Sequence, residues 1–125
     1  MRDNRTEIID RALRDFPMDT NIKVIQPAGV LDGNQTHQLR GELNDVVGTG
    51  ARLILVDLTN VTFMDSSGLA ALVTAFKTVR SAGGKLCVCS VNQQVRMLFE
   101  LTSMDRVFEI FTDQDHFIKT LTPEV

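Results

Sequence analysis

The sequence predicts an α/β domain in which a mixed, partly parallel β-sheet packs with about four α-helices. Its clearest strand signal is the run from Leu53 to Leu58, which is almost entirely apolar and short enough for a strand buried on both faces. A helical signal follows, because apolar residues recur at helical spacing at Leu69, Leu72, Val73, Phe76 and Val79. Strand and helix signals continue to alternate along the chain, and this alternation favours parallel strands joined by helices.

The N-terminal residues 1–19 are predicted to form an extension ahead of the main domain, which we place at residues 20–125. One face of a short amphipathic helix is marked by Ile8, Ile9, Ala12, Leu13 and Phe16, and Pro17 ends it. Three roles are open to this helix: packing on the core, a dimer contact, or docking of a partner. No additional strand is evident before Thr20.

The domain is expected to begin with one strand and one helix. The strand covers residues 20–28, and Pro27 indicates that its far end lies at a sheet edge or has left the ladder. Residues 29–34 are expected to form a turn that leads into a helix over roughly residues 35–47. Gly41 weakens this helix by about 1 kcal/mol relative to alanine. Glycines end the helix, and its apolar stripe consists of Leu39, Leu43, Val46 and Val47.

A buried strand at residues 52–58 comes next, followed by a turn at residues 65–68. The helix that this turn opens is expected to run to about residue 81. A glycine pair at 83–84 ends the helix, and a further strand covers residues 85–90.

The C-terminal part is expected to contain two helices and one strand. Asn92 starts a short helix whose inward residues are Val95, Leu98 and Phe99. A final strand covers residues 107–111. Asp113 then caps a last helix with an apolar face formed by Phe117, Ile118 and Leu121.

Composition predicts a one-domain cytoplasmic protein that does not bind nucleic acid directly. No apolar stretch approaches the roughly 20 residues that a membrane-spanning helix needs, and the charged N-terminal residues do not open a secretory signal. The net charge is −3 and the pI is near 5.3, whereas a nucleic-acid binder needs a basic face. Trp and Tyr are absent, which leaves little for bases to stack on.

The two cysteines, Cys87 and Cys89, are expected to be buried, small apolar residues on one face of a strand. Their placement does not suit a disulfide, because adjacent side chains on one strand diverge from the required geometry. No further cysteine or histidine cluster completes a zinc site. We therefore expect neither a metal nor a cofactor.

Asp65 and Ser66 stand where the N-cap of the central helix belongs. A serine hydroxyl at that position faces unpaired backbone N–H groups and the positive end of the helix dipole. Such a place suits an anion, including a phosphate attached to the serine itself. Two interpretations are open: a phosphorylation switch on Ser66, or simple capping by Asp65, Ser66 and Ser67.

The residues give little support to an enzyme. Ser66 lacks the flanking glycines of a nucleophile elbow, and its base would have to be His37 or His116, the two histidines of the chain. Asp57 and Asp65 suggest a magnesium site or a phospho-aspartate receiver, but the other acidic residues and the lysine of a receiver are not in place. We therefore expect Asp57 to be a strand-end residue, Asp65 to be a cap, and the protein not to be an enzyme.

The run from Phe63 to Leu69, which reads Phe-Met-Asp-Ser-Ser-Gly-Leu, together with Val56-Asp57-Leu58, resembles the signature of STAS domains, specifically of bacterial anti-sigma factor antagonists. Further segments are similar to the family in order and spacing: the Gly-Val-Leu-Asp turn at 29–32, the glycine pair and strand at 83–86, the helix at 95–102 and the strand at 107–111. The resemblance covers roughly residues 20–121.

This resemblance implies a protein controlled by partner switching. Ser66 would be the phosphoacceptor of an anti-sigma factor serine kinase with a histidine-kinase-like ATPase fold, and a PP2C-type phosphatase would remove the phosphate. The unphosphorylated chain would bind the anti-sigma factor and free the sigma factor, and phosphorylation would release it. The implied partner-binding residues are Asp32, Asp65, Ser66, Ser67 and Gly68.

Two alternatives keep the same fold. One is a STAS scaffold in a partner-switching pathway whose output is not a sigma factor. The other is a STAS domain that binds a ligand, such as a lipid or a nucleotide, in a surface groove.

Overall fold

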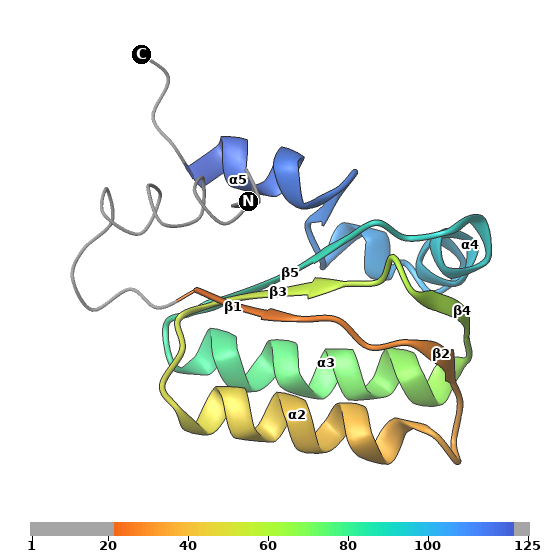
Figure 1. Cartoon of the computed structure of the whole chain (residues 1–125), viewed down its shortest axis with the longest axis horizontal. Helices are drawn as coiled ribbons and strands as arrows, with labels where there is room; N and C mark the ends of the chain where they lie inside the picture. The colour runs from red at the N-terminus through yellow and green to blue at the C-terminus, as the bar shows by residue number, and fades with distance from the viewer. Residues whose placement is uncertain (1–21, 122–125) are drawn as a thin grey trace, which may run out of the picture.

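The computed structural model describes residues 22–121, which form a β-sheet with helices on both faces (Figure 1). The predicted helix at residues 7–16 lies outside the described residues. The elements in chain order are β1 (Ile22–Ile25), β2 (Gly29–Leu31), α2 (Thr36–Gly48), β3 (Leu53–Asp57), β4 (Val61–Met64), α3 (Ser66–Ser81), β5 (Lys85–Cys89), α4 (Gln93–Leu101), the 3-10 helix η1 (Met104–Arg106), β6 (Ile110–Phe111) and α5 (Gln114–Leu121).

The main sheet has the strand order β1-β3-β5-β6, and β2 and β4 form a separate pair. Each ladder between described strands is parallel. All five residues of β3 are buried, as the apolar run predicts. The strand β1 ends at Ile25, so the chain has left the ladder before Pro27, as that residue indicates. The predicted α/β class is confirmed, with four α-helices in the described part of the chain.

Alternate residues of the central strands supply two cores on opposite faces of the sheet. On one face Ile54 and Val56 of β3 pack with residues of α2 and α3. On the other face Leu53 and Leu55 pack with Phe117 of α5. This division follows from the period of two along a strand. Cys87 and Cys89 share the α5 side, buried and not disulfide-bonded, which confirms their predicted packing role.

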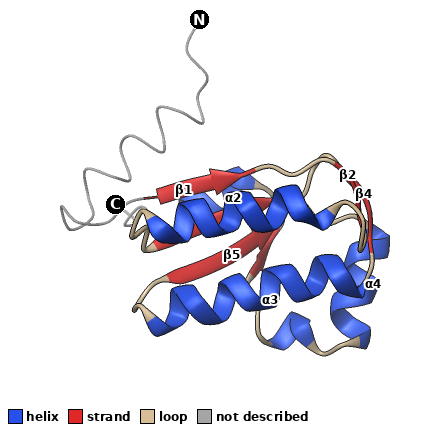
Figure 2. Cartoon of the chain, turned by 90° about the horizontal axis from the view of Figure 1, so that it is seen from below, coloured by secondary structure: helices blue, strands red, loops and turns tan. Residues whose placement is uncertain are grey.

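The helices α2 and α3 lie side by side across one face of the sheet, as the view from below shows (Figure 2). Leu39 and Leu43 of α2 are each only 2% exposed, so the predicted apolar stripe faces the core. The predicted inward residues of α3 are confirmed at Leu69, Leu72 and Val79, all buried.

Two short strands were not predicted. The segment expected to be a turn at residues 29–34 begins with β2, and Val61–Met64 forms β4. These strands pair only with each other among the described elements, and their register shifts between Gly29 and Val30. Gly29 has a φ of +80°, a conformation typical of turns, which explains why the local sequence predicts a turn here. The segment becomes a strand only because it pairs with β4.

The predicted strand at 107–111 is wrong over its first half. Only Ile110 and Phe111 pair with β5. Phe108 instead turns inward, where its ring centroid lies 5.0 Å from that of Phe76 and 5.5 Å from that of Phe99. The aromatic contacts therefore take the chain away from the sheet edge at this point.

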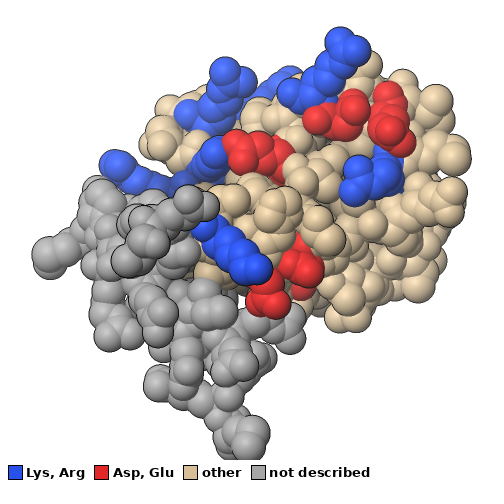
Figure 3. All heavy atoms as spheres, turned by 90° about the horizontal axis from the view of Figure 1, so that it is seen from above, with Lys and Arg blue, Asp and Glu red and all other residues tan. Residues whose placement is uncertain are grey.

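Charges of both signs are interspersed on the face that carries α5 (Figure 3). No helix within residues 22–121 is long and apolar enough to span a membrane.

Candidate functional site

The pairing of β2 with β4 brings two acidic residues to the same edge. Leu31 and Met64 are register partners in this parallel ladder. The backbone N–H of Asp65 donates to the carbonyl of Leu31 at 3.1 Å. Because parallel strands run in the same direction, Asp32 and Asp65 leave the ladder side by side, each just ahead of a helix.

Asp65 is the N-cap of α3. Its Oδ1 accepts hydrogen bonds from the backbone N–H groups of Ser67 at 2.8 Å and Gly68 at 3.3 Å. Its carbonyl accepts from Leu69 at 3.1 Å. The cap prediction is therefore confirmed for Asp65, and it is wrong for Ser66, which is the first residue of the helix and is exposed.

This cap also changes the expected surroundings of Ser66. The first-turn amides of Ser67 and Gly68 are not unpaired, because the Asp65 carboxylate already accepts from them. A phosphate on Ser66 would still be favoured by the positive end of a 16-residue helix. It would, however, stand beside the Asp65 carboxylate and project from the surface.

Asp32 shapes the turn into α2. Its Oδ1 accepts from the backbone N–H groups of Asn34 and Gln35, each at 3.0 Å, and its carbonyl accepts from Thr36 at 3.0 Å. The residue that directly precedes the helix, Gln35, makes no side-chain cap bond. Asp32 thus takes the place of a cap and, at the same time, holds a half-buried carboxylate at the surface edge.

Gly68 allows α3 to approach β2 closely. A Cβ added at this position would stand 2.8 Å from the carbonyl oxygen of Leu31 and 2.8 Å from the Cγ of Met64. On the other side of the site, a Cβ on Gly33 would lie 3.5 Å from the Ser67 Oγ. The first distance leaves no room for a side chain at Gly68, whereas the second is an ordinary contact, so the close packing of α3 on β2 depends on Gly68.

Side chains of α4 hold the strand that precedes the site. The Gln94 amide accepts from the Met64 N–H at 2.9 Å and donates to the Met64 carbonyl at 2.7 Å. Asn92 donates to the carbonyls of Val61 and Thr62 while it caps α4. The sequence indicated the cap at Asn92 but not these links, because nothing local in the sequence identifies their strand partner.

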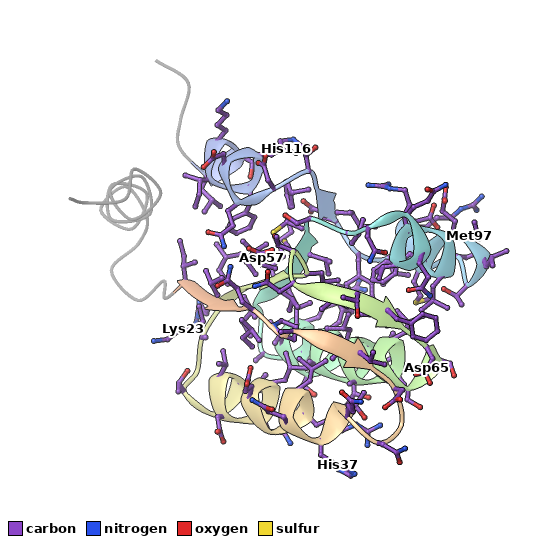
Figure 4. The ribbon with its side chains drawn as sticks, turned by 45° about the vertical axis from the view of Figure 1, so that its right-hand side comes forward. Lys23, His37, Asp57, Asp65, Met97 and His116 are labelled. Carbon is purple, nitrogen blue, oxygen red and sulfur yellow. The ribbon has the colours of Figure 1, made fainter. Side chains whose placement is uncertain are left out.

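An apolar side chain flanks the acidic edge. Phe63, one residue before Met64, is 44% exposed. Met97 on α4 is 53% exposed and lies at the same end of the molecule as Asp65 in Figure 4. Aromatic side chains and methionine are enriched in the contact surfaces between proteins.

Asp57 belongs to a different, buried network. Its carboxylate accepts from Gln26 at 2.8 Å, from Gln114 at 2.7 Å and from both the N–H and the hydroxyl of Thr59. Burial by itself raises the pKa of Asp57, but these hydrogen bonds outweigh it and leave the pKa below its usual value. The expected strand-end residue is therefore also an anchor for α5.

The structure does not assemble the catalytic or metal sites considered from the sequence. Asp57 lies beneath α5, well apart from Asp65, and His37 extends outward from α2 (Figure 4). His116 lies on α5, beyond the opposite face of the sheet. Residues 22–121 contain no group of three side chains suited to hold a metal ion.

Burial also raises the pKa of Cys87 to about 11 and that of Cys89 to about 12.

Comparison with known proteins identifies similar sequences over most of this chain. A family model described as STAS domain matches residues 15–116. The anti-sigma F factor antagonist of Paenibacillus polymyxa is 26% identical over 94 residues, which cover 74% of this chain and 80% of that protein. The anti-sigma-B factor antagonist of Bacillus subtilis (strain 168) is 30% identical over 96 residues, covering 77% of this chain and 87% of that protein.

Solved structures share the fold. An anti-sigma factor antagonist from Mycobacterium paratuberculosis gives a TM-score of 0.72 at 22% identity, covering 78% of this chain and 83% of that one. The antagonist SpoIIAA in its unphosphorylated form gives 0.68 at 20% identity, covering 83% and 92%. The phosphorylated form of the Bacillus SpoIIAA gives 0.63 at 20% identity, covering 83% and 96%.

Proposed function

Because the chain belongs to the STAS domain family of anti-sigma factor antagonists, we propose that it is a cytoplasmic partner-switching regulator controlled by phosphorylation of Ser66. Unphosphorylated, it binds an anti-sigma factor serine kinase with a histidine-kinase-like ATPase fold and so frees a sigma factor. Phosphorylated on Ser66, it releases that kinase, and a PP2C-type phosphatase restores the binding form. The chain itself is a regulator and not an enzyme.

The observation that carries this proposal is the position of Ser66. Its hydroxyl is exposed on the first residue of α3, whereas the cap role belongs to Asp65. A serine that neither caps the helix nor packs in the core can be modified without loss of a structural contact. A kinase can therefore reach this hydroxyl in the folded protein.

The contact surface that we propose surrounds this serine. It consists of Asp32, Asp65, Ser66, Ser67 and Gly68, with the exposed Phe63 as its apolar contact. The ladder between β2 and β4 holds the two aspartates at one edge, and a Cβ placed on Gly33 would be in van der Waals contact with the Ser67 hydroxyl. A partner that covers Ser66 must also cover these neighbours.

Electrostatics explain how one modification would release the partner. A phosphate adds about −1.5 to −2 charges, next to an aspartate cap and close to a second aspartate. Desolvating that group against a partner is costly, and each 1.4 kcal/mol lost weakens binding about tenfold. The Asp65 hydrogen bonds to Ser67 and Gly68 do not need to break, so the switch requires no refolding.

Substitutions at Ser66 test this mechanism against the purified kinase partner. Ser66→Ala should bind the kinase as the unmodified protein does and should resist release by ATP. Ser66→Asp should bind at least about tenfold more weakly, because it places a second carboxylate beside Asp65. The matched control is Ser81→Asp at the far end of α3, which should leave binding unchanged. Equal binding by Ser66→Ala and Ser66→Asp would refute the proposal.

A further inference from the structure

A groove runs along the C-terminal half of α3. Figure 1 shows this end of the helix opposite the end where β4 leads into it, which carries Ser66. It consists of two adjoining hollows of about 530 and 680 Å³. Phe76, Arg80 and Val107 line both hollows, and we call the whole the α3–Val107 groove. Phe76 is half-buried and Val107 is 42% exposed, so the groove has apolar walls that are open to solvent.

The groove exists because β6 is short. The strand β6 pairs only with Val88 and Cys89 of β5, and Phe108 turns inward just before it. The first half of β5 therefore has no β6 residue beside it, and Lys85 and Leu86 line the hollow at this point. The same inward turn that shortens the predicted strand opens this part of the surface.

Cations surround the groove, although the whole chain carries a net charge of −3. The lining residues include Arg52, Lys77, Arg80 and Lys85. Their acidic counterpart in the lining is Glu109, which forms an ion pair with Lys85. The negative end of the helix dipole stabilises Arg80, which lies in the last turn of α3. That role does not account for the other cations, which are Arg52 just ahead of β3 and Lys85 of β5 in one hollow and Lys77 of α3 in the other.

We propose that the α3–Val107 groove binds a small anionic amphiphile, a molecule with a phosphate or carboxylate head on an apolar body. The cations supply charge-assisted contacts for the head, and Phe76 and Val107 supply apolar surface for the body. Volumes of this size are typical of small-molecule sites. The groove lies apart from Ser66, so this inference is independent of the proposed phosphorylation switch.

Decyl phosphate, used below its critical micelle concentration, tests the proposal in titrations of ¹⁵N-labelled full-length protein by NMR. Saturable shifts should concentrate on the backbone amides of Gly83, Gly84, Leu86 and Val107. Decyltrimethylammonium, which carries the same chain on a cationic head, should not saturate these shifts, and inorganic phosphate should bind much more weakly. Shifts spread over the whole surface, or equal binding of either control compound, would overturn the proposal.

Variants separate the two parts of the site. Arg80→Gln should weaken decyl phosphate binding about tenfold, the loss expected for one charge-assisted contact. Val107→Glu should abolish binding, because it places an anion on the apolar wall. Arg96→Gln removes an exposed arginine from α4, outside the groove, and should leave binding unchanged. If Arg80→Gln and Arg96→Gln weakened decyl phosphate binding equally, binding would depend only on the overall charge of the protein, and the proposal of a site in the α3–Val107 groove would be overturned.

Discussion

Alanine substitutions at two glycines, Gly68 and Gly41, should change the free energy of unfolding in opposite directions. Both glycines lie in helices with ordinary negative φ. Alanine gains about 0.8–1 kcal/mol of intrinsic helix propensity at Gly41 in the interior of α2, and less at Gly68 in the first turn of α3. At Gly41 a Cβ would meet nothing within 4 Å. Gly41→Ala should therefore stabilise the protein by about 1 kcal/mol.

At Gly68 the same Cβ would lie 2.8 Å from the backbone oxygen of Leu31, which a side-chain rotation cannot relieve. Overpacking of this kind costs about 1–3 kcal/mol, so Gly68→Ala should destabilise the protein by about 1 kcal/mol after the propensity gain. The two variants should therefore differ by about 2 kcal/mol.

Urea unfolding followed by far-UV circular dichroism measures both values, and this probe is needed because the chain contains no Trp or Tyr. If Gly68→Ala stabilised the protein as much as Gly41→Ala, this would refute the claim that α3 packs too closely on β2 to leave room for a side chain at Gly68.

Three further predictions concern the buried network, the thiols and the link from α4. Since the pKa of Asp57 is lowered in the fold, its carboxylate stabilises the protein at pH values above the unfolded pKa of about 3.9, and this stabilisation is lost as the pH falls through the folded pKa. In acid titrations the free energy of unfolding should therefore fall less steeply for Asp57→Asn than for the natural chain. Parallel curves of unfolding free energy against pH would contradict this. Cys87 and Cys89 should react with a thiol reagent in mildly alkaline solution only as fast as the protein opens, because burial raises the pKa of both thiols. A reaction rate in the native protein equal to the rate in urea would be inconsistent with their burial. Gln94→Ala should lower the free energy of unfolding in urea by about 1–3 kcal/mol, because it leaves the Met64 backbone N–H and carbonyl unpaired. Gln93 is exposed, so Gln93→Ala should be nearly neutral. An equal loss in both variants would argue against the link between Gln94 and Met64.

Elements with a strong local signal could be predicted from the sequence. The apolar run of β3 is too short for an ordinary helix, and the apolar residues of α3 recur at helical spacing. Asp65, Asn92 and Asp113 are short polar residues ahead of apolar periodic segments, and each accepts a hydrogen bond in the first turn of its helix.

The β2–β4 ladder could not be predicted in this way. Each strand is only three or four residues long, and its extended form depends on a partner some thirty residues away in the chain. This ladder is what places Asp32 beside Asp65, so the acidic edge of the candidate site is a tertiary feature. The links from Gln94 to Met64 have the same origin.

The anchoring role of Asp57 is also beyond a local signal. The sequence places it at a strand end, but Gln26 and Gln114 reach it from segments 31 and 57 residues away. Likewise, the inward turn of Phe108 depends on rings from α3 and α4, which meet it only in the folded chain.

The most direct test of the central claim is phosphopeptide mapping by mass spectrometry. The natural chain, Ser66→Ala and Ser67→Ala would each be incubated with ATP and soluble extract of the native host. The account predicts phosphate on Ser66 in the natural chain and in Ser67→Ala, and its absence from Ser66→Ala. Phosphate confined to Ser67, or none at all in an extract that modifies other proteins, would contradict the assignment of Ser66 as the switch.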